Sequence, residues 1–210
     1  MAEPVRRVAD GDPPPTRWAL AGSARGGYAE NFARLVEAGA DVDGEARLAD
    51  ALLPRGARVL DVGSGMGRVA AALADRGHDV LAVEPDQDLV AQSRRTYPAL
   101  EVVEADVLAL SPADVGTFDL VVCVGNVLVF LAEGTERRVL AHLRSLLAPG
   151  GRVLAGFHLS GAPAAARRWS AADFTADAAA EGLRVDLRAG SYELHPPDDS
   201  YAVWLLSAAD

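Results

Sequence analysis

The sequence contains no lysine, a single cysteine, few aromatic side chains and no apolar run long enough to cross a membrane. Its 20 basic residues are all arginine, and they are outnumbered by 30 acidic residues, which leaves a formal net charge of −10 and a pI near 4.8. Proteins that hold nucleic acid without sequence preference need clustered basic side chains to neutralise phosphates. The charge balance therefore argues against DNA or RNA as a partner, and nothing predicts contact with a membrane.

Cys123, the one cysteine, cannot form an internal disulfide. It lies in the apolar run Val121–Val124, which favours a small buried side chain over a nucleophile. The N-terminus carries acids and prolines where a signal peptide would have an apolar core. We therefore expect a cytoplasmic protein; the sequence leaves its oligomeric state open.

At 210 residues, half of them hydrophobic, the chain can form one α/β domain with a sizeable core. Residues 1–17 contain three consecutive prolines and little periodicity, and we predict a flexible leader there. Residues 18–56 should form N-terminal helices, one of them over Ala29–Ala38, that can act as a lid, and residues 57–210 should form the main domain.

The chain is organised around residues 57–70. A short apolar run containing Asp61 meets glycines at alternate positions, Gly63, Gly65 and Gly67, and a helical pattern follows at once. This arrangement predicts a buried strand, a tight turn and the start of a helix. Because glycine has no Cβ, the turn can bring backbone close to a ligand, and the free N–H groups of the first helical turn suit a polar or anionic group. The alternative is a tight strand-to-helix connection without a ligand.

Asp61 and Glu84 favour the ligand-binding interpretation. Glu84 ends the next predicted strand, about twenty residues beyond the turn, where an acid that binds a ribose is expected. The spacing G-x-G-x-G differs from the G-x-G-x-x-G of dinucleotide-binding folds, and Asp61 adds a carboxylate on the entering side. A carboxylate there suits an ammonium or sulfonium group better than two phosphates.

These residues resemble the class I S-adenosylmethionine-dependent methyltransferases of the small-molecule type. The resemblance covers roughly residues 28–160. It is carried, in order, by Val-Leu-Asp61-Val-Gly63-Ser-Gly65-Met-Gly67, Val83–Asp86, Glu104–Val107, Phe118–Cys123 and Leu147–Val153.

Alternating strands and helices predict a three-layer, doubly wound α/β fold of the Rossmann-like type. The resemblance implies a mostly parallel seven-stranded sheet whose antiparallel last strand is inserted between two parallel ones. After the glycine turn we expect helices over 68–76, 86–95, 134–147 and 171–181, and strands over 79–83, 101–104, 118–124, 151–157, 183–187 (extending as far as Tyr192) and 201–206.

The resemblance also implies which residues bind the cofactor. The turn Gly63, Ser64, Gly65 and Gly67 would pass beneath the methionine and ribose parts, with Asp61 near the amino-acid part. Glu84 and the adjoining Pro85 would lie at the ribose, Asp106 would accept from the adenine amino group with the Val107 amide toward the ring, and Gly125 and Asn126 would contact the methionine part and the substrate entrance. Strand ends of such sheets meet at one rim, which is an independent reason to expect one site.

The catalytic residue is harder to identify. His158 follows the fifth strand, at the same rim, and an imidazole suits removal of a proton from an acceptor. A structural or solvated histidine is the alternative. Tyr28 and Trp169, together with His158, are candidates for the substrate-binding wall. The acidic residues around position 43 lack further ligands at metal spacing, so no metal site is predicted.

The sequence therefore predicts an enzyme that transfers a methyl group from S-adenosylmethionine to an oxygen or nitrogen of a small molecule, leaving S-adenosylhomocysteine. Two alternatives remain open. One is a regulator that binds the cofactor without turnover. The other is an NAD-dependent oxidoreductase, which the glycine spacing and Asp61 oppose.

Overall fold

The computed structural model describes residues 14–22, 34–35, 38 and 40–209. The predicted leader lies outside these residues as far as position 13, as do Tyr28 and most of the helix expected over 29–38. None of the helices in the described ranges is both long and apolar enough to span a membrane.

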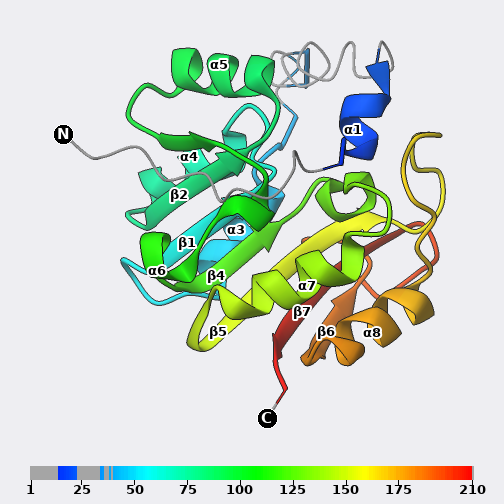
Figure 1. Ribbon diagram of the computed structural model, residues 1–210. Helices are drawn as coiled ribbons and strands as arrows, with labels where there is room; N and C mark the ends of the chain where they lie inside the picture. The colour runs from blue at the N-terminus through cyan, green and yellow to red at the C-terminus, as the bar shows by residue number, and fades with distance from the viewer. Residues whose placement is uncertain (1–13, 23–33, 36–37, 39, 210) are drawn as a thin grey trace.

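One seven-stranded sheet forms the centre of the molecule, in the order β3-β2-β1-β4-β5-β7-β6 (Figure 1). Every pairing from β3 to β5 is parallel, whereas β7 runs antiparallel to both of its neighbours. The predicted fold, with its last strand inserted between two parallel strands, is confirmed. The strands are β1 (Arg58–Val62), β2 (Asp79–Glu84), β3 (Glu101–Glu104), β4 (Phe118–Cys123), β5 (Leu147–His158), β6 (Leu183–Ala189) and β7 (Tyr201–Ala208).

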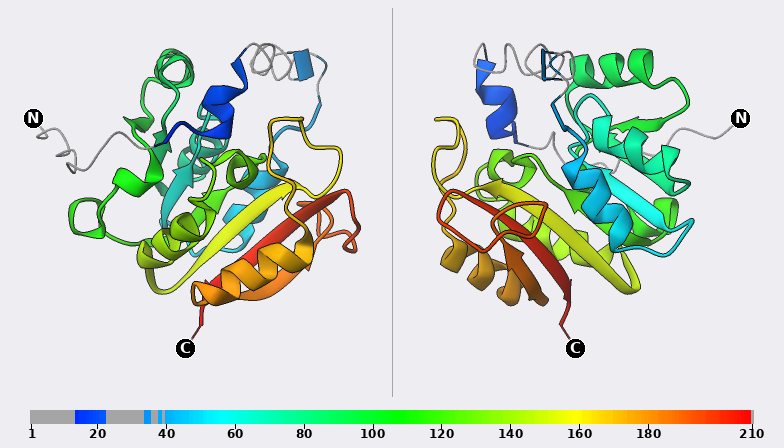
Figure 2. Two further views of the ribbon diagram at one scale, coloured as in Figure 1. Left: turned by 45° about the vertical axis from the view of Figure 1, so that its right-hand side comes forward. Right: turned by 180° about the vertical axis from the view of Figure 1, so that it is seen from behind.

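Helices cover both faces of the sheet (Figures 1 and 2). One buried apolar cluster lies under α3, α4 and α5, and the other lies under α7 and α8. The central strands are apolar on both faces because both faces are covered. The helices are α1 (Arg17–Leu20), α3 (Gly44–Ala51), α4 (Arg68–Asp75), α5 (Gln87–Thr96), η2 (Val107–Ala109), α6 (Pro112–Val115), η3 (Val127–Phe130), α7 (Glu136–Ser145) and α8 (Ala171–Ala180).

Most predicted elements agree with the structure to within two residues at each end, but β5 begins earlier than the expected Gly151. Its first residue, Leu147, pairs with Phe118 before the ladder resumes at Arg152, so the connection from α7 joins the sheet directly. β6 ends at Ala189 and does not reach Tyr192, because the Gly190 amide bonds to the His195 carbonyl and turns the chain.

The turn after β1 brings α4 very close to α5. Gly67 has a φ of +84°, and a Cβ placed on it would lie 2.3 Å from Ser93 Oγ and 2.9 Å from Leu100 Cδ2. Gly77, at the other end of α4, has a φ of +89°, but a Cβ placed on it would meet nothing within 4 Å. The two glycines share a backbone conformation and differ in packing.

We therefore expect Gly67→Ala to lower the free energy of unfolding by about 2–4 kcal/mol, combining left-handed strain with overpacking. The matched control Gly77→Ala should cost only the strain, about 1 kcal/mol. Urea denaturation of both variants tests the difference. Equal losses would show that α4 and α5 can separate at no cost.

Candidate functional site

The carboxyl ends of the parallel strands carry the predicted site residues, as the sequence led us to expect. Asp61 lies in β1 opposite Ala82 of β2, Glu84 ends β2, and Gly125 and Asn126 follow β4. His158 ends β5. Two cavities adjoin at this rim and share Gly63, Gly125 and Asn126 in their walls.

The first cavity, of about 440 Å³, lies between the glycine turn and two segments that cover it. Trp18 of α1 is part of one cover, and residues 163–165 form the other. Trp18 Nε1 donates to Asp86 Oδ2 at 2.8 Å, and its ring meets Phe130 edge-on at 5.6 Å. The residues of its wall that the sequence analysis had predicted are Gly63, Gly65, Glu84, Pro85, Asp106, Val107, Gly125 and Asn126.

Glu84 is a buried carboxylate whose position is fixed from both sides. Its Oε2 accepts from the Gly65 amide and its Oε1 from the Asp86 amide, each at 2.9 Å. Burial raises the pKa of Glu84, and these two amides act in the opposite direction. A carboxylate oxygen accepts more than one hydrogen bond, so both oxygens retain acceptor capacity in the wall of the first cavity.

Asp106 lies on the same wall, next to Val107. It precedes η2, and its Oδ1 accepts from the Leu108 amide at 2.8 Å. That contact orients the carboxylate beside the cavity. Asp106 and Glu84 thus give an otherwise largely apolar cavity two separate acceptor groups.

The second cavity, of about 320 Å³, is more polar. Asp61 in its wall is only 2% exposed, and its Oδ2 has no hydrogen-bond partner among the described residues. The hydroxyl of Ser64, in the same wall, also lacks one there. Two buried oxygens that face one cavity without partners indicate a place for a polar ligand group.

Burial raises the pKa of Asp61 to about 7. The attraction of Arg68 and a hydrogen bond from the Ala70 amide act against this shift, and repulsion from Glu84 and Glu45 adds to it. Arg68 is itself held by both carboxylate oxygens of Glu45, at 2.7 and 3.0 Å. Asp61 is therefore a carboxyl that a cationic ligand group would readily convert to its charged form.

His158 and Asn126 form a hydrogen-bonded pair. Asn126 Oδ1 lies 2.9 Å from the backbone nitrogen of His158 and 3.0 Å from the His158 ring Nδ1. Since the backbone N–H can only donate, the amide oxygen is the acceptor, and the Nδ1 facing it must carry the proton. The neutral ring then has its lone pair on Nε2, as a proton acceptor requires.

Trp169 does not occupy the substrate-facing position suggested for it. The side chain is 1% exposed and stacks on Phe157 at 6.0 Å. Its Nε1 donates to Asp177 Oδ2 at 3.0 Å, and the residue lines neither of the two cavities. A large indole fits the core between β5 and α8, and this long-range packing has no local signal in the sequence.

Several residues of the cavity walls were not predicted from the sequence. Tyr192 and Tyr201 line the second cavity, with their hydroxyls 2.8 Å apart, although they are nine residues apart in the C-terminal part of the chain. Only the fold brings them to this rim. Arg68 was recognisable, because it directly follows the glycine turn at the start of a helix. Among the described residues there is no cluster of three or more side chains suited to a metal ion.

Comparison with known proteins places the chain in a family. Residues 59–151 match the methyltransferase domain family. A TehB-like SAM-dependent methyltransferase from Corynebacterium glutamicum has 34% sequence identity and a TM-score of 0.77, over 90% of this chain and 99% of that one.

Curated relatives match over shorter stretches. A malonyl-[acyl-carrier protein] O-methyltransferase from Enterobacter lignolyticus is 36% identical over 110 residues, which is 50% of this chain and 42% of that protein. A ribosomal RNA small subunit methyltransferase A from Bordetella pertussis is 46% identical over 61 residues, 28% of this chain and 23% of that protein. The chain thus matches about half or less of the length of these relatives.

The nearly full-length likeness at 34% identity, together with the domain match, the strand order and the glycine turn, leads to one conclusion. The chain belongs to the class I S-adenosylmethionine-dependent methyltransferases.

Proposed function

We propose that this enzyme holds S-adenosylmethionine across the two adjoining cavities and methylates an oxygen or nitrogen of a small-molecule acceptor. The observation that carries the proposal is the placement of two buried carboxylates, Glu84 and Asp61, in two cavities that meet at the glycine turn. The cavities fit the parts of the cofactor: a nucleoside in the first and a charged amino-acid part in the second.

In the first cavity, Glu84 would accept from both ribose hydroxyls, since each of its oxygens already has one amide donor and keeps further acceptor capacity. Asp106 would accept from the adenine amino group beside Val107 and Pro85. In the second cavity, Asp61 would receive the ammonium group, and the Ser64 hydroxyl would satisfy a polar atom of the same part. Gly63 and Gly65 lie in the cavity walls, where a Cβ on Gly63 would collide with Val127; Gly67 lines neither cavity and packs against α5.

When bound, the cofactor would supply an electrophilic methyl group on its sulfonium, and the leaving group would be the neutral thioether, S-adenosylhomocysteine. The protein's task is to orient the acceptor, exclude water and remove the acceptor's proton. His158 Nε2, whose lone pair is set by the Asn126 contact, is our candidate for accepting that proton. Apolar cover from Trp18, Phe130 and residues 163–165 would keep water from the reacting atoms.

Two features support a small-molecule acceptor. The net charge of −10, without any lysine, disfavours a nucleic-acid backbone. The covered cavities also favour a compact acceptor over a macromolecular surface. The names of the relatives specify different acceptors, among them ribosomal RNA and malonyl-[acyl-carrier protein], so the shared region does not identify the acceptor of this chain.

We also propose that the protein works in the cytoplasm. The single buried Cys123 is compatible with a reducing compartment.

Glu84→Gln should weaken the binding of S-adenosylhomocysteine by about tenfold to a hundredfold, because one charged acceptor of two hydrogen bonds is lost. Glu104→Gln is the matched control, since Glu104 pairs with Glu84 in register at the end of β3 but is exposed. Calorimetric titration of both variants measures the affinities. Unchanged affinity in a folded Glu84→Gln protein would remove Glu84 from the ribose.

Asp61→Asn should have opposite effects on stability and on binding. Folded Asp61 has a pKa of about 7 against an ordinary 3.8, so charging it costs stability in full above pH 7 and not at all below pH 3.8. The variant should therefore melt at a higher temperature than the native protein at pH 8, with the difference shrinking toward pH 5. Its affinity for S-adenosylhomocysteine should fall by about tenfold or more.

Thermal melting and titration at pH 5, 6.5 and 8 test this prediction. Asp75→Asn, which removes an exposed carboxylate from α4, controls for the loss of one charge. An Asp61→Asn protein that is less stable than the native protein at pH 8 would contradict the predicted cost of charging Asp61. An Asp61→Asn protein that binds S-adenosylhomocysteine as well as the native protein would contradict the predicted role of Asp61 in binding.

His158→Ala should leave the affinity for S-adenosylhomocysteine unchanged and lower kcat by about a hundredfold or more, as expected for the loss of a general base. The assay uses the first acceptor found in a screen of hydroxylated and amino compounds, followed by release of S-adenosylhomocysteine. His195→Ala, in the exposed turn before β7, is the control. A normal kcat in His158→Ala would return this histidine to a purely structural role.

A further inference from the structure

Two segments far apart in the sequence cover the first cavity. One surrounds α1 and contributes Thr16, Trp18 and Ala21, and the other comprises residues 163–165 after β5. Neither segment belongs to the sheet. Each needs an attachment elsewhere to stay over the cavity.

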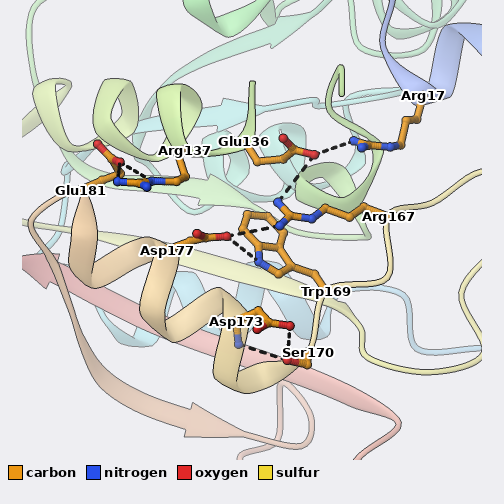
Figure 3. Close-up of polar contacts among 9 residues, drawn as sticks. All are labelled: Arg17, Glu136, Arg137, Arg167, Trp169, Ser170, Asp173, Asp177 and Glu181. Carbon is orange, nitrogen blue, oxygen red and sulfur yellow. Dashed lines mark hydrogen bonds and ion pairs between the residues drawn. The ribbon is translucent and has the colours of Figure 1, made fainter. Parts of the chain in front are cut away.

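Both covers are attached to one carboxylate, that of Glu136 at the start of α7 (Figure 3). Arg17 Nη1 lies 2.8 Å from Glu136 Oε1, and Arg167 Nη1 lies 3.6 Å from the same oxygen. Arg17 is the first residue of α1, and Arg167 lies two residues beyond segment 163–165. Glu136 itself does not line either cavity.

The attachment is largely shielded from water. The side chains of Glu136 and Arg17 are 8% and 17% exposed, and that of Arg167 is 27% exposed. Burial acts to raise the pKa of Glu136, but hydrogen bonds from its own amide and from Arg17, with the attraction of both guanidinium groups, hold it below its ordinary value. Glu136 therefore carries its charge throughout the neutral range.

Both arginines also contact η3 and the residue after it, which line one wall of the first cavity. Arg17 Nη1 donates to the Leu131 carbonyl at 2.8 Å, and the Arg167 amide donates to the Val129 carbonyl at 2.8 Å. Arg167 also reaches Asp177 of α8 at 3.3 Å and lies over the Trp169 ring. Within the described part of the chain, Glu136 is the one side chain that both guanidinium groups contact.

We propose that Glu136 is a positioning residue that holds both covers over the first cavity at once and thereby controls how fast the cofactor and its product leave. The inference rests on the proposed function, because it takes that cavity to be the nucleoside site. Neutralising Glu136 would remove the shared anion and leave two guanidinium groups facing each other. Both covers would then loosen together.

The test compares Glu136→Gln with Arg137→Gln. Arg137 is the next residue of α7, and its ion pair with Glu181, at 2.6 Å, is directed away from the covers (Figure 3). Surface plasmon resonance on the immobilised full chain measures association and dissociation of S-adenosylhomocysteine. We expect Glu136→Gln to raise the dissociation rate about tenfold without slowing association, and Arg137→Gln to behave as the native protein.

The association rate separates positioning from a merely structural role, because partial unfolding would lower the fraction of binding-competent protein and slow association. Arg17→Gln and Arg167→Gln, each of which frees one cover, should raise the dissociation rate by a smaller factor. In the Glu136→Gln background, Arg17→Gln should have a smaller effect than in the native background, since only its contact with the Leu131 carbonyl is left to lose.

Two results would overturn the inference: native dissociation kinetics in a folded Glu136→Gln protein, or an Arg17→Gln effect of the same factor in both backgrounds. If Glu136→Gln does not fold, the single arginine variants decide, and native dissociation rates in both would overturn it. Failure of the native protein to bind S-adenosylhomocysteine would instead refute the proposed function.

Discussion

The hydrogen bond from the Gly65 amide to the Glu84 carboxylate joins the turn after β1 to the end of β2, and the arrangement of the whole rim depends on it. The turn is also held by the Val83 carbonyl, which accepts from the Gly63 and Ser64 amides. These contacts require a backbone that only glycine adopts easily, with φ near +60° at Gly63 and Gly65. Once the turn is fixed, the floors of both cavities are fixed with it.

The two cavities differ in how they treat charge. The first has two acceptors, Glu84 and Asp106, in a largely apolar wall. The second concentrates Asp61, Glu45 and Arg68 in a small volume, where burial raises the pKa of Asp61 to about 7. A cofactor with an uncharged nucleoside at one end and a charged amino-acid part at the other matches this division. The covers add a third element, because charges away from the cavities hold them in place.

The sequence predicted the alternating α/β sheet and the common rim, because local signals mark them: apolar runs, the glycine turn and acids at strand ends. The inserted last strand was implied by the resemblance to the methyltransferase family, not by a local pattern. The sequence also led to Glu84, Asp61 and Asp106 as residues of one site, and the structure brings them to adjoining walls. It did not predict Tyr192 and Tyr201 at the second cavity, the core position of Trp169, or the shared contact of Arg17 and Arg167 with Glu136. Each of these depends on contacts between distant segments, which no local pattern records.

The central claim is that one site at this rim binds a sulfur nucleotide. Calorimetric titration of the full chain, freed of any co-purified ligand, with S-adenosylmethionine, S-adenosylhomocysteine and NAD tests it most directly. The account predicts binding of both sulfur nucleotides with one site per chain and no heat from NAD. Binding of NAD, with neither sulfur nucleotide binding to the folded protein, would contradict it.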